Sequence, residues 1–391
     1  MGFDITIDKN NKIVVTGSSY NGLNGDMVIL RYNQDGSLDT TLRNSGIVVY
    51  NNAAGGNGLD IGYAIKIDKS NNIIVAGSSF NGNNKDFAIW HFKDNGLIDN
   101  SFGNSGIVIL DHLASTSSDD IAYDLVLDKN ENIFVVGSSK KLNSNIEIAI
   151  VKLKKDGTLD STFGNNGKVI LGNINSEDKV YSITLDKNDK ILIVGDPNIN
   201  CTKDMAVVRL NPDGSLDNSF ANNGYLIHNS AAGGNSTDIG YDIIVDNNNK
   251  ILITGTSSDS HHFNMVIWKL NPDGSFDSSF GNNGIKVYFN IAGKEGDVGK
   301  ALAIDNNNRV YVTGFRIDNL NDMVVWRINN SDGSIDKSFG ENGVVVHHNT
   351  AGGRKEDIAT SITINSDNKA VVTGFSNNGV DKDLVVWKLK D

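Results

Sequence analysis

Short apolar runs separated by polar turns follow one another along the whole chain. Residues 65–68 alternate between apolar and polar positions, and residues 191–195 form a continuous apolar run that ends at a glycine. Two further runs, 265–270 and 285–288, are joined by a segment rich in Gly, Asn, Asp and Ser. None of these runs has a helical period, so the pattern predicts short strands connected by tight turns.

The pattern repeats every 58 to 60 residues. The first strand of each unit ends at Asp8, Asp68, Asp128, Asp186, Asp246, Asp305 and Asn365. A glycine closes the second strand with the same spacing, at Gly17, Gly77, Gly137, Gly195, Gly255, Gly314 and Gly374. Because two landmarks share one spacing, the repeat defines seven units, at about 1–60, 61–120, 121–178, 179–238, 239–297, 298–357 and 358–391.

Each unit contains four predicted strands, which form one antiparallel sheet. A single sheet of this kind exposes two apolar faces, and packing seven sheets around an axis buries both faces of each. We therefore expect an all-β fold, a seven-bladed β-propeller of four-stranded antiparallel blades, with residues 1–391 in a single domain. An open β-solenoid is the alternative, but its coils usually run roughly 20–30 residues, which favours the propeller.

The last blade is predicted to lack one strand. Residues 1–3 align with residues 61–63, and residue 391 directly follows the third strand of unit seven. That blade is therefore expected to be three-stranded unless a strand from outside the chain completes it, for example from a longer parent protein. The predicted edge at residues 384–387 is apolar, so self-association through this edge is a further expectation.

Composition narrows the classes of partner. The formal net charge is −12 and no basic cluster is present, which argues against a nucleic-acid ligand. No apolar run is long enough to predict membrane insertion. Cys201 is the only cysteine, and no metal-ligand spacing occurs, so neither a metal nor a cofactor is expected.

The segment before the fourth strand carries a resemblance to a known family. The pattern Asp-Gly-Ser-Leu-Asp-x-Ser-Phe-x-x-Asn-Gly, with small departures, spans Asp156–Gly167, Asp213–Gly224, Asp273–Gly284 and Asp332–Gly343. In these residues the chain resembles the delta-60 repeat bacterial propellers, which are distantly similar to NHL-type propellers. Unit one departs from the pattern, with Leu42 in place of the phenylalanine. The resemblance implies an extracellular or cell-surface bacterial protein and no established activity.

Aspartates before the first strands are one candidate site. They recur in six units, at Asp60, Asp120, Asp178, Asp238, Asp297 and Asp357. In a propeller they would surround one mouth of the central channel, where converging carboxylates attract a cation. The alternative is a repeated turn in which each carboxylate caps backbone N–H groups, and recurrence in nearly every blade favours that interpretation.

The loops between second and third strands vary most and are the other candidate site. Variable loops on a regular scaffold are where binding specificity usually lies. The candidate ligand-binding residues on this loop face are Tyr20, Phe80, His261, His262 and Arg316. The four tryptophans share one third-strand position with Leu and Val, which indicates core packing; the next position is basic and is expected to pair with an acid in the following turn.

These patterns favour a non-catalytic scaffold that binds a protein or a glycan. The units are too alike to indicate one asymmetric polar cluster, so catalytic residues are not assigned and no enzymatic activity is expected. Two alternatives stay open. One is a structural protein that assembles through residues 384–387, and the other is a propeller hydrolase or lyase.

Overall fold

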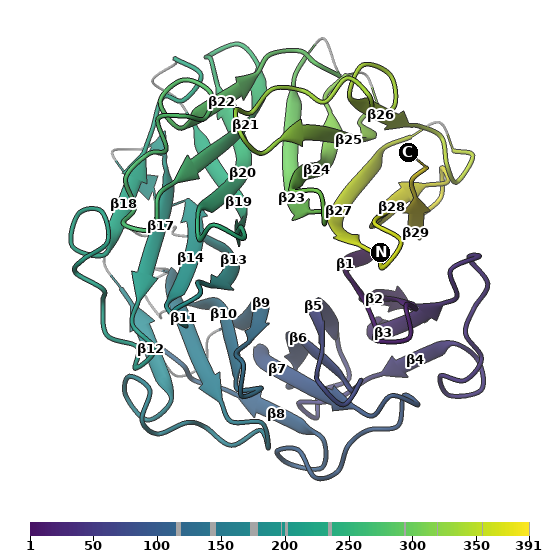
Figure 1. Ribbon diagram of the computed structural model, residues 1–391. Helices are drawn as coiled ribbons and strands as arrows, with labels where there is room; N and C mark the ends of the chain where they lie inside the picture. Colours follow the sequence, from purple (N-terminus) through teal and green to yellow (C-terminus); the bar gives the residue numbers. More distant parts are fainter. Residues whose placement is uncertain are drawn as a thin grey trace. The chain divides into compact units, whose positions relative to one another are not determined.

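The computed structural model consists of strands and turns. It describes residues 1–114, 119–140, 146–172, 179–196, 198–199, 202–233, 237–292, 295–318, 320–353 and 355–390. Most strands gather into seven consecutive antiparallel sheets, each built from neighbouring segments of the chain (Figure 1). Within the described residues, no helix is long and apolar enough to cross a membrane.

The first three sheets each have four strands in sequence order. Blade one contains β1 (Gly2–Ile7), β2 (Ile13–Tyr20), β3 (Gly25–Tyr32) and β4 (Ile47–Tyr50). Blade two contains β5 (Ile61–Ile67), β6 (Ile73–Phe80), β7 (Lys85–Phe92) and β8 (Ile107–Leu110). Blade three contains β9 (Asp120–Leu127), β10 (Ile133–Lys140), β11 (Ile146–Leu153) and β12 (Lys168–Leu171).

Blades four to six have the same order. Blade four contains β13 (Lys179–Leu185), β14 (Ile191–Asp196), β17 (Met205–Leu210) and β18 (Tyr225–His228), with a hairpin of β15 (Asn198–Ile199) and β16 (Thr202–Lys203) between its second and third strands. Blade five contains β19 (Asp238–Val245), β20 (Ile251–Ser258), β21 (Phe263–Leu270) and β22 (Ile285–Tyr288). Blade six contains β23 (Asp297–Ile304), β24 (Arg309–Arg316), β25 (Asp322–Asn329) and β26 (Val344–His347).

Blade seven has three strands. They are β27 (Asp357–Ile364), β28 (Ala370–Asn377) and β29 (Lys382–Lys388). Among the described residues, β29 pairs with β28 alone. The predicted seven-bladed β-propeller, with four-stranded antiparallel blades and a three-stranded last blade, is confirmed.

The chain divides into two compact units. One comprises Gly2–Ile183 and Asn211–Ser215 and holds blades one to three. The other comprises Met1, Thr184–Leu210 and Leu216–Asp391 and holds blades five to seven with most of blade four.

Apolar side chains of neighbouring blades share each core. In the larger unit, Met265 and Ile267 of blade five form one buried cluster with Leu302 and Val312 of blade six. Burying each such side chain stabilises the folded state by about 1.5–3 kcal/mol. An isolated sheet would leave these side chains exposed to water and would lack this stabilisation. Four tryptophans are buried, as expected: Trp90, Trp268, Trp326 and Trp387.

A β-bulge in the first strand explains the repeated glycine of the second. In blade five, Gly240 pairs with Gly255 and Asp242 pairs with Thr254, so Tyr241 is the extra residue. A Cβ on Gly255 would lie 1.8 Å from the backbone oxygen of Ile239, closer than any real contact. Only glycine fits this position, because the bulge brings the two backbones together.

Candidate functional site

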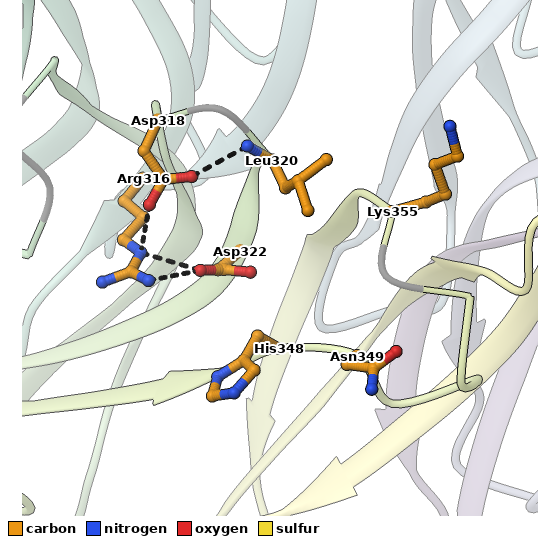
Figure 2. A pocket seen from close by; sticks show the side chains of 7 residues that line it. All are labelled: Arg316, Asp318, Leu320, Asp322, His348, Asn349 and Lys355. Atoms are coloured by element: carbon orange, nitrogen blue, oxygen red, sulfur yellow. Dashed lines mark hydrogen bonds and ion pairs between the residues drawn. The ribbon is translucent and has the colours of Figure 1, made fainter.

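A pocket of about 500 Å³ lies between a connection of blade six and the loop that joins blade six to blade seven (Figure 2). Its lining comes from the β24–β25 connection and from the loop between β26 and β27. The residues that line it are Arg316, Asp318, Leu320, Asp322, His348, Asn349 and Lys355. All of them belong to the larger unit.

The strand ends hold Arg316 in place. Arg316 is the last residue of β24 and faces Asp322, the first residue of β25, across the ladder. Its Nε and Nη2 donate to Asp322 Oδ2 at 2.9 and 2.5 Å. Asp318 Oδ2 lies 3.1 Å from Nε, and Nη1 donates to the carbonyl oxygen of Ala292 at 3.3 Å. These contacts orient the guanidinium before any ligand arrives.

The opposite part of the pocket is more exposed. His348 and Asn349 directly follow β26, and Lys355 lies two residues before β27. All three are exposed, and Asn349 has a left-handed backbone with φ 57°, a conformation that asparagine tolerates well. In Figure 2 the cluster of Arg316 and its two carboxylates lies on one side and Lys355 on the other.

The pocket offers donors and acceptors in balance. Arg316 and Lys355 carry positive charge, while Asp318 and Asp322 carry negative charge, so the four formal charges cancel. Leu320, 42% exposed, adds an apolar surface. Such a lining can donate hydrogen bonds to a polar ligand and accept them from it, while one apolar contact orients the ligand.

One of the five predicted loop-face residues lines this pocket. Arg316 does so, and it lies in a connection that the sequence marks as variable. His261 is exposed and His262 half-buried; they neighbour each other at 6.3 Å between ring centroids, outside the lining. Tyr20 is 73% exposed and donates its hydroxyl hydrogen to the Gly22 carbonyl at 3.1 Å. Phe80 is half-buried and close to Gly58.

Sequence reasoning missed the other six lining residues. His348 stands in a histidine pair that the sequence displays, but its partners come from two separate loops. The available signal was the variability of the connections between second and third strands, one of which carries Asp318 and Leu320. Which members of those loops meet is decided by the packing of blade six against blade seven, which no local pattern records.

The described first-strand aspartates are buried and bind backbone. Asp60 Oδ2 accepts a hydrogen bond from Asn52 N at 2.7 Å, and Asp297 Oδ2 accepts two, from Ile291 N and Ala292 N. Leu113 N, Ala231 N and Thr350 N donate to Asp120, Asp238 and Asp357 at 3.3–3.4 Å. Asp178 lies outside the described residues. Each described carboxylate therefore supports its own loop, and a cation site formed by these aspartates stays a prediction.

Burial changes the acidity of some of these aspartates. It raises the pKa of Asp238 to about 6, against the hydrogen bond from Ser257, which favours the ionised form. Burial also raises the pKa values of Asp60 and Asp120. Within the part of the chain that the structure describes, no three His, Cys, Asp or Glu side chains are grouped so that they would hold a metal ion.

Comparisons with known proteins support a propeller repeat family. A family model described as "Domain of unknown function (DUF5122) beta-propeller" matches residues 9–42, 132–163, 187–220 and 247–280. These ranges lie in blades one, three, four and five, and each ends at Leu42 or the equivalent phenylalanine. No curated protein matches the chain. The finer resemblance, to delta-60 repeats and NHL-type propellers, is not confirmed by these matches.

Several solved structures are similar to the chain at low sequence identity. Polysaccharide lyase Uly1 has a TM-score of 0.55 and 11% identity, covering 99% of this chain and 89% of its own. A protein of unknown function from Bacteroides caccae has a TM-score of 0.44 and 12% identity, and the match covers 86% of this chain and 98% of the other. An ulvan lyase of family PL25, bound to a GlcA–Rha3S unit, has a TM-score of 0.46 and 13% identity. The match covers 88% of this chain and 77% of the other.

The sequence-based expectation that the chain is not an enzyme is contradicted by the likeness to polysaccharide lyase Uly1. It rested on the likeness of the seven units, but a polysaccharide lyase carries the same propeller architecture over nearly the whole chain. A repeated scaffold therefore does not exclude catalysis, because activity depends on a few side chains in its loops. The chain is thus similar to β-propeller repeat proteins of unknown function and shares its fold with one polysaccharide lyase, Uly1.

Proposed function

We propose that the chain binds a saccharide in the pocket formed by Arg316, Asp318, Leu320, Asp322, His348, Asn349 and Lys355. The observation that supports this most is the balance of oriented donors and acceptors around one cavity. Sugar hydroxyl groups both donate and accept hydrogen bonds, so they match a lining whose formal charges cancel. Leu320 supplies an apolar contact for the carbon–hydrogen face of a sugar ring.

Preorganisation strengthens this proposal. Arg316 is held by Asp318, Asp322 and the carbonyl of Ala292, so little side-chain entropy is lost when a ligand contacts it. The cavity of about 500 Å³ is within the range of small-molecule sites. Asp322 is largely buried, whereas His348 and Lys355 are exposed, so ligand contacts concentrate on the outer residues.

Binding is tested with a glycan array followed by calorimetry on the saccharides that bind. Replacing both exposed residues (His348→Ala with Lys355→Ala) should weaken binding about tenfold or more, because two hydrogen bonds at about 1 kcal/mol each are lost. His112→Ala is the matched control, an exposed histidine outside the pocket. Saccharide affinity that survives the double substitution, or an array without a ligand, contradicts the proposal.

A second candidate function is cleavage of a uronate-containing polysaccharide at the same pocket. His348 carries an imidazole, which can accept a proton, and it lines the same pocket as the cationic side chains of Arg316 and Lys355. This grouping favours the second candidate. In β-elimination, a base removes the proton on the carbon next to the uronate carboxylate and a C=C bond forms. The C–O bond to the leaving sugar breaks, and the leaving oxygen takes up a proton to become a hydroxyl group. His348 would be the base, and Arg316 or Lys355 would neutralise the carboxylate.

Cleavage is measured by the ultraviolet absorbance of the unsaturated sugar product. His348→Ala should lower the rate about 100-fold or more, as expected on loss of a general base, while His112→Ala should leave it unchanged. Saccharide binding without any rise in absorbance supports binding and rejects cleavage.

A further inference from the structure

Ten asparagine–glycine steps occur along the chain. At such a step the backbone nitrogen of the glycine can attack the carbonyl carbon of the asparagine side chain, because glycine has no Cβ to obstruct the approach. The attack needs a nitrogen that is not engaged in a hydrogen bond and a carboxamide that can turn towards it. The fold therefore decides which of the ten steps can react.

Four of these steps are protected by the turn before the fourth strand. The N–H of each glycine donates to the carbonyl oxygen of the phenylalanine that lies three residues before the asparagine, at 2.7–2.8 Å. In blade five, for example, Gly284 N donates to Phe280 O at 2.7 Å. A nitrogen held in this way can attack only after the turn opens. The four asparagines, all exposed, are Asn166, Asn223, Asn283 and Asn342.

Three further steps are fixed at the backbone of the glycine. Gly96 N donates to Lys93 O at 2.8 Å. Gly379 N donates to Asn377 Oδ1, also at 2.8 Å. Gly25 is the first residue of β3 and is held in the ladder with β2. Attack at these steps requires local opening of the turn or of the strand end.

Two steps have a fixed asparagine side chain instead. Asn21 Oδ1 accepts hydrogen bonds from the N–H groups of Leu23 and Asn24, at 2.9 and 3.1 Å. Its carboxamide nitrogen donates to Asn24 Oδ1 and Asp26 Oδ2, at 2.6 and 2.9 Å. Asn81 makes the equivalent hydrogen bonds in blade two. These side chains can turn towards the glycine nitrogen only if several hydrogen bonds break.

The remaining step, Asn57–Gly58, has neither restraint. Asn57 is exposed and lies in the loop between β4 and β5. Among the described residues, the N–H of Gly58 has no hydrogen-bond acceptor. The Asn57 carboxamide accepts one hydrogen bond, from Asn24 Nδ2, and its length of 3.3 Å is above the usual range. The nitrogen is thus available for attack, and the carboxamide can turn towards it at little cost.

We propose that Asn57 is a modification site at which the folded chain deamidates without an enzyme. The Gly58 nitrogen attacks the carboxamide carbon of Asn57, a C–N bond forms, and ammonia leaves with the proton of that nitrogen. Water then opens the cyclic imide at one of its two carbonyl carbons. The product is aspartate, or isoaspartate with one extra carbon in the main chain. Neither residue lines the saccharide pocket, so the site is independent of it.

Either product changes the contacts of this loop. Aspartate places a negative charge beside the carboxamide of Asn24. Isoaspartate lengthens the main chain directly before Gly58, whose carbonyl oxygen accepts a hydrogen bond from Asn24 Nδ2 at 2.9 Å and whose Cα packs against the ring of Phe80. The modification should therefore loosen the packing of Phe80, one of the predicted loop-face residues.

The test follows deamidation of the unmodified full chain over time at mildly alkaline pH. Samples are digested at acidic pH, and peptide mass spectrometry gives the rate at each asparagine, while an isoaspartyl methyltransferase reports the isoaspartate. Asn283 is the internal control, because it is also exposed but its glycine N–H is bonded. Asn57 should deamidate about fivefold or more faster than Asn283, because the control must first break a hydrogen bond.

The unfolded chain separates the effect of the fold from that of the local sequence. In urea the turn hydrogen bonds are lost, so Asn57 and Asn283 should deamidate at similar rates. Asn57→Gln should abolish the product at this position in the folded chain and leave the rate at Asn283 unchanged. Equal rates at Asn57 and Asn283 in the folded chain, or a difference that persists in urea, overturn the proposal.

Discussion

Arg209 and Asp217 form a buried ion pair, with 2.7 Å between Nε and Oδ2. Both side chains are at most 6% exposed, and the guanidinium also lies 4.6 Å from the centroid of the Phe220 ring. The pair recurs between Arg31 and Asp39 and between Arg327 and Asp336. The sequence predicted this repeated pairing from the basic residue after the tryptophan position and the acid in the following turn.

Blade five departs from that pairing. Lys269 donates to Asn330 Oδ1 at 2.9 Å, and Asp277 pairs instead with Lys250 at 3.2 Å. The pairing expected at this position is therefore not made in blade five, although Lys152, the equivalent lysine of blade three, lies 3.0 Å from Asp160.

Breaking one buried pair should destabilise the fold. Arg209→Met removes the guanidinium partner of Asp217, which keeps its 2.5 Å ion pair with Lys190, so we expect the free energy of unfolding to fall by about 2 kcal/mol. Urea denaturation followed by tryptophan fluorescence measures it. Arg43→Met, at an exposed arginine, is the control and should change stability by less than about 0.5 kcal/mol. Equal effects of the two substitutions would show that the pair does not stabilise the blade.

The buried carboxyl of Asp238 should make stability depend on pH. Its pKa is raised to about 6 by burial, while in the unfolded chain it titrates near 4. Between these values the folded state binds more protons, so the free energy of unfolding should decrease as the pH rises from about 4 to about 6. Asp238→Asn should reduce that slope in urea denaturation at a series of pH values. A slope unchanged by the substitution contradicts this assignment.

The bulge makes Gly255 intolerant of a side chain. Gly255→Ala would place Cβ 1.8 Å from the Ile239 carbonyl oxygen, so the two backbones must separate. We expect a loss of about 3 kcal/mol or more in thermal or urea unfolding. Gly233→Ala is the control: it has φ +89° but nothing within 4 Å of the added Cβ, so about 1 kcal/mol is expected. A loss at Gly255 no larger than at Gly233 would argue against the steric explanation.

An aspartate joins blade five to blade six. Asp242 Oδ2 accepts a hydrogen bond from Leu302 N at 2.8 Å, and Oδ1 accepts one from Ile243 N at 2.9 Å. The equivalent position of blade seven carries Ser361. Asp242→Ser should therefore cost about 1–2 kcal/mol of unfolding free energy, and Asp242→Asn less. If both substitutions leave the urea midpoint unchanged, the hydrogen bond to Leu302 does not stabilise the interface.

The edge of β29 should promote association between copies of the chain. Leu384, Val385 and Val386 are half-buried, whereas most residues of the equivalent strands are buried. Light scattering over a concentration series should show a mass above 42.1 kDa that Val386→Lys lowers, because a charge on an edge strand disfavours pairing. Leu97→Lys, at an exposed apolar residue away from this edge, is the control. A constant monomer mass for the unmodified chain contradicts this expectation.

The architecture was predictable because its determinants are local and repeated. The period of about 60 residues, the apolar runs and the turn glycines each act within one unit, and seven copies of the same pattern reinforce one interpretation. The three-stranded last blade follows from counting strands in the same way. The recurrent Gly255 was visible as a landmark, although the reason for it, the backbone contact with Ile239, appears only in the structure.

The sequence by itself determined the number of blades, the order of strands in each blade and the repeated ion pair of Arg209 with Asp217. The tertiary structure alone decided that Arg316 meets His348 and Lys355 around one pocket, and that Lys300 lies over the ring of Tyr241. The physical reason is separation along the chain. Strand patterns and turns arise from interactions between near neighbours, whereas these groupings depend on how one blade packs against the next.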